Sequence, residues 1–357
     1  MAEKVLVAMS GGVDSTVSVR ILQEQGYEVA GATMKLLPDS DERVEKTAAL
    51  AKRLGIDFFV FDLVDRFERD VIDEFAESYI KGSTPNPCVR CNKLLKFGRL
   101  LDLARERGFS KIATGHYARI VEDEQGGMHL FRSSDTAKDQ SYFLFNLNSG
   151  LMRYVLFPLE GMKKEQVRAI AAGLGLENAA QKDSQDICFV PDGNYMNVID
   201  RYCAKHGLER KEGVFVDTEG RILGKNPGIE RYTIGQRKGV GMALGGEKPL
   251  YVISKDPEKN AVVMGDDSLL FSSTVTVGNV NFTSPDKKYA AAEFPGKLTC
   301  RTRSCQKFLP VSIKYDSGRN TILAEFDAPV RAVTPGQFAV FYDGDEVVCG
   351  GEIISGK

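Results

Sequence analysis

Three cysteines lie in sequence surroundings where a thiol can act as a nucleophile. Cys88 and Cys91 belong to the stretch TPNPCVRCNK, in which two prolines stiffen the chain, and Cys188 belongs to the polar stretch KDSQDICF. Positive charge and a nearby helix start lower the pKa of a thiol and favour thiolate. No acidic residue occurs at positions 89–99, where basic side chains recur at three-residue spacing: Arg90, Lys93, Lys96 and Arg99.

The chain has seven cysteines. An odd number of cysteines in a chain expected to be cytosolic argues against a disulfide framework. It argues for free, catalytic or metal-bound thiols. A C-x-x-C pair can be half of a zinc site, but only Cys188 is a good candidate for the other half, and the spacing of Cys300 and Cys305 is weak support for a remote site. Four cysteines are predicted to be small buried core residues: Cys203, Cys300, Cys305 and Cys349.

A second group of residues is suited to binding phosphate. In SGGVDS, Gly11 and Gly12 allow backbone N–H groups to converge on an anion, and the positive end of a following helix adds to the attraction. Ser10 and Ser15 can donate hydrogen bonds, and Asp14 can hold Mg²⁺. The alternative is a tight turn with a Ser or Asp N-cap. Neither G-x-x-x-x-G-K-[ST] nor G-x-G-x-x-G opens the fold, which argues against a P-loop NTPase and a dinucleotide oxidoreductase.

The elements that must position these residues alternate between strands and helices over the first 200 residues. Short apolar runs predict strands at residues 4–9, 28–34, 57–64 and 111–116. Stretches with helical periodicity predict helices at residues 15–25, 42–54, 66–79, 94–107 and 163–174. Such alternation predicts βαβ units, so the expected fold class is α/β with a Rossmann-like parallel sheet.

After about residue 206 the pattern changes to short β-type runs separated by Gly, Asp and Asn turns. This pattern is typical of small β-barrels or sandwiches, and a break near residues 267–272 divides it in two. We therefore predict a catalytic domain at residues 1–205, a central β-rich domain at 206–270 and a C-terminal β-barrel domain at 271–357.

Length, composition and charge are those of an ordinary globular protein. The 357 residues are 43% hydrophobic and 27% charged, without the apolar run of a membrane helix or the pattern of a signal peptide. We therefore expect a cytoplasmic protein with no membrane partner. The net charge of −2 gives no global sign of nucleic-acid binding. Residues 225–238 and 297–307 nevertheless form local basic runs, for which a solvated face is the alternative interpretation.

The phosphate loop resembles the pyrophosphate-binding loop of the N-type ATP pyrophosphatases, which cleave ATP between the α- and β-phosphates and adenylate a carbonyl oxygen. The whole chain resembles the bacterial tRNA-specific 2-thiouridylases, which are tRNA-uridine 2-sulfurtransferases. The matching segments run in order along the chain: AMSGGVDS, TPNPCVRCNKLLKFG, ATGHYA, KDQSYFLF, KDSQDICFVP, YTIGQRKGVG and TPGQFAVFYDGDEVVCGGEII.

The resemblance implies ATP-dependent 2-thiolation of the wobble uridine in the tRNAs for Lys, Glu and Gln. ATP with Mg²⁺ would adenylate O2 of the uridine. A persulfide on Cys188, loaded by a cysteine desulfurase or a relay protein, would deliver sulfur to C2. Cys91 would be the second catalytic cysteine, and a transient Cys91–Cys188 disulfide would form. The implied ATP-binding residues are Ala8, Met9, Ser10, Gly11, Gly12, Val13, Asp14, Ser15, Met34 and Gly115.

The resemblance also implies tRNA as a partner, bound in part by the central domain, and no DNA partner. The target base must leave the anticodon loop to reach ATP and the cysteines. A loop of Asn86, Pro87 and Cys88 would contact that base. The implied tRNA-binding residues are His116, Lys138, Asp139, Gln140, Arg303, Ser304 and Gln337.

Two positions depart from the commoner family pattern. Cys88 stands where many members have Asp, and Asn226 stands where His is expected. Related sulfur-transfer enzymes hold a [4Fe–4S] cluster with three thiols, so Cys88, Cys91 and Cys188 offer an alternative route to the same reaction. Two rivals belong to other classes: an ATP pyrophosphatase ligase that acts on a small molecule, and an iron–sulfur or zinc RNA-binding protein without ATP cleavage.

Overall fold

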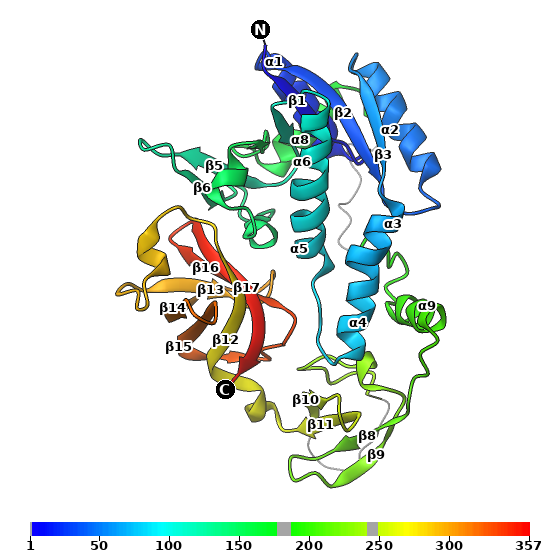
Figure 1. Cartoon of the computed structure of the whole chain (residues 1–357), viewed down its shortest axis with the longest axis vertical. Helices are drawn as coiled ribbons and strands as arrows, with labels where there is room; N and C mark the ends of the chain where they lie inside the picture. The colour runs from blue at the N-terminus through cyan, green and yellow to red at the C-terminus, as the bar shows by residue number, and fades with distance from the viewer. Residues whose placement is uncertain (1, 177–186, 241–248) are drawn as a thin grey trace.

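The computed structural model describes residues 2–176, 187–240 and 249–357. The polar residues 182–186 that precede Cys188, and the end of the YTIGQRKGVG segment at residue 241, lie outside the described residues. Figure 1 shows an N-terminal α/β part, a small sheet formed by β8–β11 and a barrel formed by β12–β17. The α/β, β-rich and β-barrel classes predicted from the sequence are therefore confirmed.

The N-terminal part is built on a parallel sheet with the strand order β3-β2-β1-β4-β7. Val5 of β1 pairs with Val29 on one side and with Lys111 on the other. Val5 and Val7 pack with α1 and α2, whereas Leu6 belongs to the core on the opposite face, so β1 is apolar throughout. The strands are β1 (Lys4–Ala8), β2 (Glu28–Lys35), β3 (Phe58–Asp62), β4 (Lys111–Ala113) and β7 (Val155–Leu156). The helices around this sheet include α1 (Val13–Glu24), α2 (Asp41–Arg53) and α8 (Lys164–Gly173).

Two interrupted helices run from the sheet toward the β8–β11 sheet (Figure 1). The first consists of α3 (Val64–Phe67), the π-helical segment η1 (Glu68–Asp73) and α4 (Glu74–Ile80). The second consists of α5 (Pro87–Cys91), the π-helical segment η2 (Asn92–Arg99) and α6 (Leu100–Glu106).

The second helix begins at Pro87, earlier than the predicted start at residue 94. Proline suits the first turn, where its missing N–H needs no partner. The side chain of Asn86 caps this turn by accepting the Val89 N–H at 3.4 Å. Cys88 and Cys91 therefore lie on a helix and not at the end of a loop.

The C-terminal residues form a closed antiparallel barrel, because β12 pairs with both β15 and β17. The hairpin of β5 (Ala118–Glu122) and β6 (Met128–Arg132) extends this sheet, with Leu130 opposite Val347 of β17. The sequence analysis did not predict this hairpin. The barrel strands are β12 (Phe271–Phe282), β13 (Leu298–Arg301), β14 (Leu309–Asp316), β15 (Thr321–Arg331), β16 (Phe338–Asp343) and β17 (Glu346–Gly356).

The central sheet has the strand order β10-β11-β8-β9 and is joined to the α/β part by α9 (Met196–His206). Tyr195, at the start of α9, stacks on Tyr79 of α4 with ring centroids 4.5 Å apart. The strands are β8 (Gly213–Val216), β9 (Ile222–Asn226), β10 (Tyr251–Asp256) and β11 (Ala261–Gly265). The shorter helices are η3 (Ser141–Leu144), α7 (Ser149–Met152), η4 (Ile229–Arg231), η5 (Asp267–Leu270) and η6 (Lys287–Ala290).

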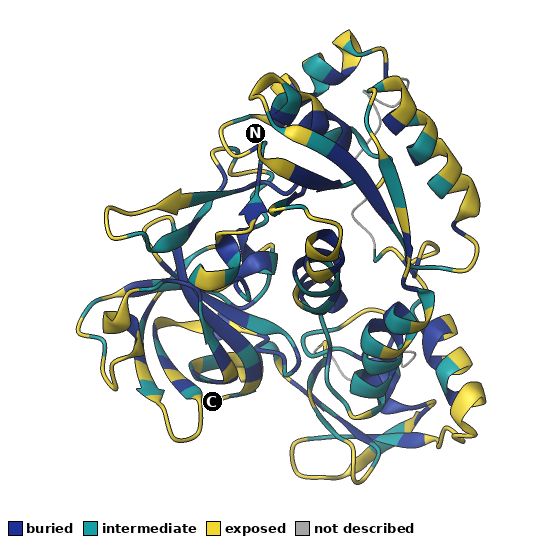
Figure 2. Ribbon diagram, turned by 45° about the horizontal axis from the view of Figure 1, so that its top comes forward, coloured by how far each residue is buried: buried dark blue, intermediate teal, exposed yellow. Residues whose placement is uncertain are grey.

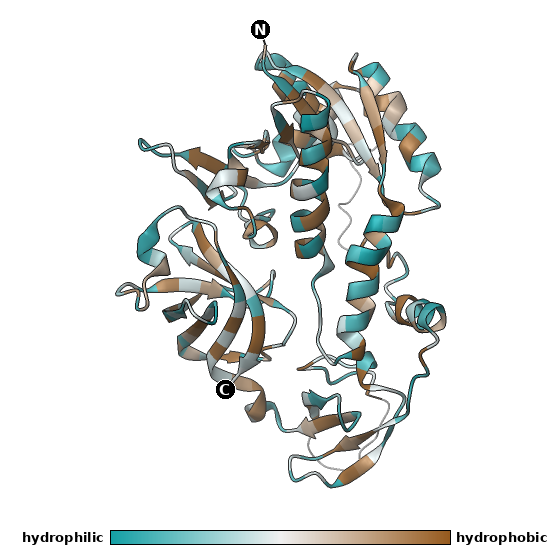
Figure 3. Cartoon of the chain, in the orientation of Figure 1, coloured by the Kyte–Doolittle hydropathy of each residue, from teal (hydrophilic) through white to brown (hydrophobic). Residues whose placement is uncertain are grey.

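One apolar core extends from the α/β part into the barrel. Leu130 and Tyr142 share it with Val340, Tyr342 and Val347 of β16 and β17. Figure 2 shows buried residues in the strands of both parts, and Figure 3 shows apolar segments in the same strands. In the described part of the chain, no helix combines the length and apolarity needed to cross a membrane.

Candidate active site

The carboxyl ends of β1, β2 and β4 border a cavity of about 380 Å³. Ligand sites of parallel α/β sheets lie at this edge. The cavity brings together most of the residues predicted for ATP and for sulfur chemistry, although they come from distant parts of the sequence. The predicted residues that line it are Ala8, Met9, Ser10, Asp14, Ser15, Met34, Pro87, Cys88, Cys91, Gly115, His116, Gln140 and Cys188.

The phosphate loop connects β1 to α1, so the N-terminal end of α1 lies at the cavity. Gly11 has a φ of +79°, and a Cβ there would lie 2.8 Å from Thr47 Oγ1 of α2. A Cβ on Gly115 would lie 2.9 Å from the backbone of Asp14 and Ser15. Both glycines therefore allow close packing around a loop whose backbone N–H groups and helix end attract anions.

Asp14 is held by two residues that the sequence analysis did not single out. Lys164 Nζ lies 2.7 Å from both carboxylate oxygens of Asp14, and the Tyr117 hydroxyl donates to Oδ1 at 2.9 Å. Asp14 is the carboxylate among the cavity-lining residues. Mg²⁺ commonly takes one or two carboxylates together with substrate phosphates. Because Lys164 pairs with both carboxylate oxygens of Asp14, an ion bound there would require Lys164 to move.

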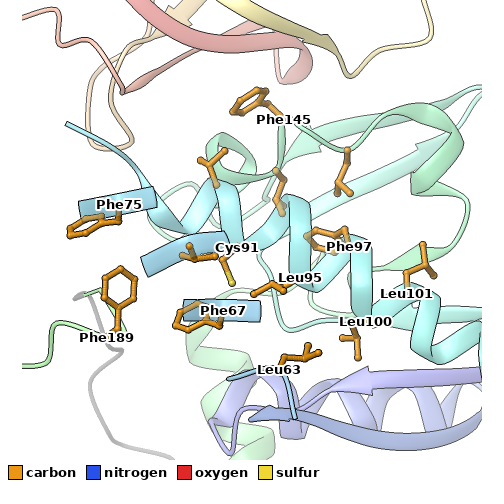
Figure 4. Close-up of a cluster of buried hydrophobic side chains, with 14 of the residues drawn as sticks. Leu63, Phe67, Phe75, Cys91, Leu95, Phe97, Leu100, Leu101, Phe145 and Phe189 are labelled. Atoms are coloured by element: carbon orange, nitrogen blue, oxygen red, sulfur yellow. The ribbon is translucent and has the colours of Figure 1, made fainter. Parts of the chain in front are cut away.

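Cys91 is 8% exposed and packs in the core that also contains Phe67 and Leu95 (Figure 4). Burial raises the pKa of the Cys91 thiol to about 11, against the lowering effect of the Lys96 charge. Although Cys88 and Cys188 are exposed, desolvation of their sulfur atoms also raises the pKa of both thiols. The predicted lowering of these pKa values is therefore wrong for the protein without ligands, because burial outweighs the nearby charge.

Most of the basic run after Cys88 points away from the thiols. Arg90 donates to the Asp70 carbonyl oxygen and lies 3.5 Å from Glu74, and Arg99 pairs with Glu106. Lys93 is exposed. Lys96 is the member of the run that lines the cavity. Another cation, Arg43 of α2, also lines the cavity and lowers the pKa of Cys188, against the larger effect of burial.

The arrangement of the thiols bears on the metal alternatives. In residues 2–176, 187–240 and 249–357, no group of three or more His, Cys, Asp or Glu side chains is placed to hold a metal ion. Cys88, Cys91 and Cys188 share the cavity, but they do not converge as a ligand set. The described geometry therefore does not fit a bound cluster without movement of these side chains.

The remaining cysteines were predicted to be buried. Cys203, Cys300 and Cys349 are buried, which confirms the prediction for these three. Cys305 is exposed in the turn after β13, next to Ser304, so the prediction is wrong there. A zinc site shared by Cys300 and Cys305 is not present among the described residues.

His116 lies in the cavity and not on an outer RNA-facing surface. Its Nδ1 is 2.7 Å from Thr114 Oγ1, and its Nε2 is 3.4 Å from Lys96 Nζ. Burial, with the Lys96 charge acting in the same direction, lowers the pKa of His116 well below its usual range. The ring is therefore neutral. Gln140 also lines the cavity and accepts the Tyr117 N–H at 3.0 Å.

Asp139 has a structural environment. Its side chain is 1% exposed and pairs with Arg132 and Arg301 at 3.6 and 3.4 Å, across the junction with the barrel. It also accepts the backbone N–H groups of Ser133 and Ser141. Lys138 precedes it and is half-buried.

The other predicted RNA contacts lie on the barrel. Arg303 donates to the Ala332 carbonyl at 2.9 Å and to Thr334 Oγ1 at 2.7 Å, and Ser304 is half-buried beside it. Gln337 donates to the loop that precedes Cys88.

Asn226, the second departure from the family pattern, is buried. Its Oδ1 accepts the Gly228 N–H at 2.9 Å. The short amide therefore supports the turn after β9 in this chain.

Lys164, Tyr117 and Arg43 had no signal in the sequence, because each is separated from its partner in the chain and is brought to it only by the fold. Lys164 reaches Asp14 across 150 positions. No local spacing rule predicts such a pair.

A Rossmann-like sheet with an anion-binding first loop, followed by two β-domains, defines an enzyme class built on a HUP domain. Family models agree with this class. The tRNA methyl transferase HUP domain matches residues 3–192, the tRNA methyl transferase PRC-barrel domain matches 201–266, and the aminomethyltransferase beta-barrel domain matches 272–353.

Curated proteins that are similar over nearly the whole chain identify a family within this enzyme class. The tRNA-specific 2-thiouridylase MnmA of Acetivibrio thermocellus is 46% identical, covering 98% of this chain and 99% of that protein. Those of Clostridioides difficile and Carboxydothermus hydrogenoformans are each 43% identical, covering 99% and 98% of this chain and 98% and 97% of those proteins. The chain belongs to the tRNA-specific 2-thiouridylase family.

Proposed function

We propose that the chain catalyses ATP-dependent 2-thiolation of the wobble uridine in the tRNAs for Lys, Glu and Gln. As a member of its family it is a tRNA-uridine 2-sulfurtransferase that uses ATP and acts on tRNA. The observation that carries the finer proposal is the single cavity that contains both the phosphate loop and the thiols of Cys91 and Cys188. Activation and sulfur delivery can therefore occur on one bound base.

The first step requires the phosphate loop. The backbone of residues 8–15 and the N-terminal end of α1 would hold the ATP phosphates, with Met34 and Gly115 beside the adenosine. Mg²⁺, bound by Asp14 and the phosphates, would offset the phosphate charge. The uridine O2 attacks the α-phosphorus, and pyrophosphate leaves. The C2–O bond then has AMP as a leaving group.

The second step requires two cysteines. The terminal sulfur of a Cys188 persulfide attacks C2, and AMP leaves with the former O2. The Cys91 thiolate then attacks Cys188 Sγ, which breaks the bond to the transferred sulfur and releases 2-thiouridine. A Cys91–Cys188 disulfide remains, and an external thiol must reduce it. The sulfur comes from a cysteine desulfurase or a relay protein.

Lys96 supports this assignment, since its charge favours the anionic form of each thiol in the cavity.

The test is nucleoside mass spectrometry of tRNA from a deletion strain that carries wild type, Cys91→Ser, Cys188→Ser or Cys305→Ser. Wild type and the control Cys305→Ser should restore 2-thiouridine-type nucleosides. The Cys91 and Cys188 variants should not, although the purified proteins should still release pyrophosphate from ATP in the presence of tRNA, because adenylation precedes sulfur transfer. Thiolation by Cys188→Ser would contradict the persulfide route, and turnover of ATP with a small molecule instead of tRNA would favour a ligase.

The alternative route, in which Cys88, Cys91 and Cys188 would hold a [4Fe–4S] cluster, requires these side chains to move, because they share the cavity without converging as a ligand set. Anaerobically purified protein would then contain iron and acid-labile sulfide, and Cys88→Ser would lose both. Iron-free protein with full activity would eliminate this route.

A further inference from the structure

The C-terminal barrel forms hydrogen bonds with the loop that leads to Cys88, at Thr84 and Pro85. The Thr84 N–H donates to the Pro335 carbonyl at 2.9 Å. Gln337 Nε2 donates to the Thr84 carbonyl at 2.9 Å and to the Pro85 carbonyl at 3.4 Å. These contacts join positions about 250 residues apart in the sequence, one on the catalytic loop and the other at the start of β16.

The packing at this contact leaves no room for a side chain at Gly336. Gly336 has a φ of +87°, and a Cβ there would lie 2.9 Å from both the Ser83 Cβ and the Thr84 nitrogen. Thr84 is buried. On the other side of the loop, a Cβ on Gly82 would lie 2.9 Å from Pro257 of the central domain. Two domains that lie outside the parallel sheet therefore contact the loop.

Gln337 itself is fixed by the barrel. Its carbonyl accepts the Ile353 N–H at 2.8 Å, and its N–H donates to the Thr334 carbonyl at 3.2 Å. The side-chain amide therefore projects from a rigid strand end onto the loop. Its donor satisfies two adjacent backbone acceptors that would otherwise lose their partner.

The position of this loop determines the position of the Cys88 and Cys91 thiols, because only a few residues separate the loop from α5. Pro85 and Pro87 restrict the backbone on either side of Asn86, whose side chain caps α5. Cys88 and Cys91 lie in this helix and line the cavity. A shift of the Thr84 and Pro85 carbonyls would therefore move the start of α5, and with it both sulfur atoms.

We propose that Gln337 is a positioning residue for sulfur transfer: its amide clamps the Thr84–Pro85 backbone and so fixes Cys88 and Cys91 against the bound base. The inference rests on the proposed function. It assigns Gln337 a role inside the protein, in addition to the direct tRNA contact implied by the sequence resemblance. It also makes the barrel part of the active-site framework.

The test compares Gln337→Met, which has similar length but no donor, with Gln337→Lys, which restores an N–H donor. Gln306→Met is the matched control, because the Gln306 side chain bonds only to Thr302 of its own loop among the described residues. Each full-length protein is assayed in single turnover for pyrophosphate release and 2-thiouridine formation, for tRNA Kd, and for hydrogen exchange of peptides that span residues 82–92.

For Gln337→Met we expect thiouridine formation to slow about tenfold, since small displacements of reacting groups reduce rates by one or two orders of magnitude. Pyrophosphate release at saturating tRNA should change less than about twofold, and exchange at residues 82–92 in the free protein should accelerate. Gln337→Lys should recover most of the transfer rate, and Gln306→Met should match wild type.

Two results would overturn the role of Gln337. One is unchanged exchange and unchanged sulfur transfer in folded Gln337→Met. The other is a raised tRNA Kd with unchanged exchange, which would make Gln337 a tRNA contact only. Absence of thiouridine with the wild-type protein is a different failure, because it contradicts the proposed function while the exchange measurement still reports on the clamp.

Discussion

At the scale of single residues, burial raises the pKa of the three thiols in the cavity. Lys96 and Arg43 are the cations among the cavity-lining residues, and they oppose this effect. A thiol with a raised pKa resists oxidation and alkylation at rest, because the thiolate is the reactive form. The site therefore combines reactivity during turnover with protection between turnovers.

The raised pKa of Cys91 predicts slow alkylation. Because this pKa is about 11, the thiolate fraction at pH 7–9 is small and rises about tenfold per pH unit. We expect iodoacetamide to modify Cys91 far more slowly than the exposed Cys305 at pH 8, with a rate that increases steeply up to pH 9. Peptide mass spectrometry measures both rates in one sample. A rate for Cys91 that is constant over this range would contradict the assignment.

Replacement of Lys96 tests the electrostatic contribution separately. Lys96→Met removes a charge that lowers the pKa of the Cys91 thiol, so this pKa should rise. The alkylation rate of Cys91 at pH 8.5 should fall about threefold to tenfold. Lys93→Met is the control, because Lys93 is exposed one turn away on the same helix. Equal effects of the two substitutions would show that the cavity position of Lys96 has no special role.

Residue types and spacing led to the predictions of a phosphate loop and of reactive thiols, and the structure brings most of these residues to one cavity. They did not predict the Asp14–Lys164 pair, which joins two distant helices. They also gave the wrong direction for the thiol pKa values. Charge can be counted along a sequence, whereas desolvation depends on the tertiary packing around Cys91.

At the scale of elements, the β5–β6 hairpin is attached to the barrel by a histidine between two carboxylates. His129 Nδ1 lies 2.7 Å from Glu346 Oε1 of β17, and Nε2 lies 3.0 Å from Asp123 Oδ2. Burial lowers the pKa of His129, but the hydrogen bonds to Asp123 and Glu346 outweigh this effect, and the net pKa is raised. When it is protonated, His129 therefore forms an ion pair that joins β6 to β17.

This arrangement predicts pH-dependent stability. A histidine whose pKa is raised by folding stabilises the fold fully below its unfolded pKa of about 6.5, and this contribution is lost as pH rises through the folded pKa. His129→Asn should therefore lower Tm by about 2–4 °C at pH 6 and by clearly less at pH 9. His206→Asn, on the exposed end of α9, is the control. Thermal unfolding at both pH values measures the effect. An equal decrease in Tm at pH 6 and pH 9 would exclude protonated His129 as the connection between β6 and β17.

Helices and strands were predicted accurately where the hydrophobic periodicity was strong. The predictions failed where proline and glycine residues suggested a loop and where strands were short. The central strands were predicted within a few residues, because both faces of β1 and β2 are apolar. The start of α5 was missed because two prolines and a glycine suggested a loop. Pro87 instead begins a helix whose N-cap is Asn86. The hairpin was missed because its strands are short and find their partner 217 positions away.

At the scale of the whole molecule, the barrel and the α/β part share one core. Removing β16 and β17 would expose Leu130 and Tyr142, which pack with Val340, Tyr342 and Val347. A chain that ends at residue 270 should therefore aggregate or lose the cooperative unfolding of the full chain, because buried apolar area becomes exposed.

Size-exclusion chromatography and thermal unfolding of this truncated chain measure the effect, with the full-length protein as the reference. A monomeric truncated chain that unfolds at the wild-type Tm would show that the two parts are independent. Such coupling could not be predicted from the sequence, in which the change of pattern near residue 206 suggested separate units.

The pairing of β6 with β17 also bears on the order in which the chain is synthesised. Leu130 faces Val347, so the ribosome must add more than 200 further residues before the hairpin meets its partner strand. At about 5–20 residues per second, the N-terminal part waits about 10–45 s with this edge unpaired. The growing polypeptide therefore carries an open strand edge until β16 and β17 have emerged, and these two strands then complete the core that Leu130 and Tyr142 begin.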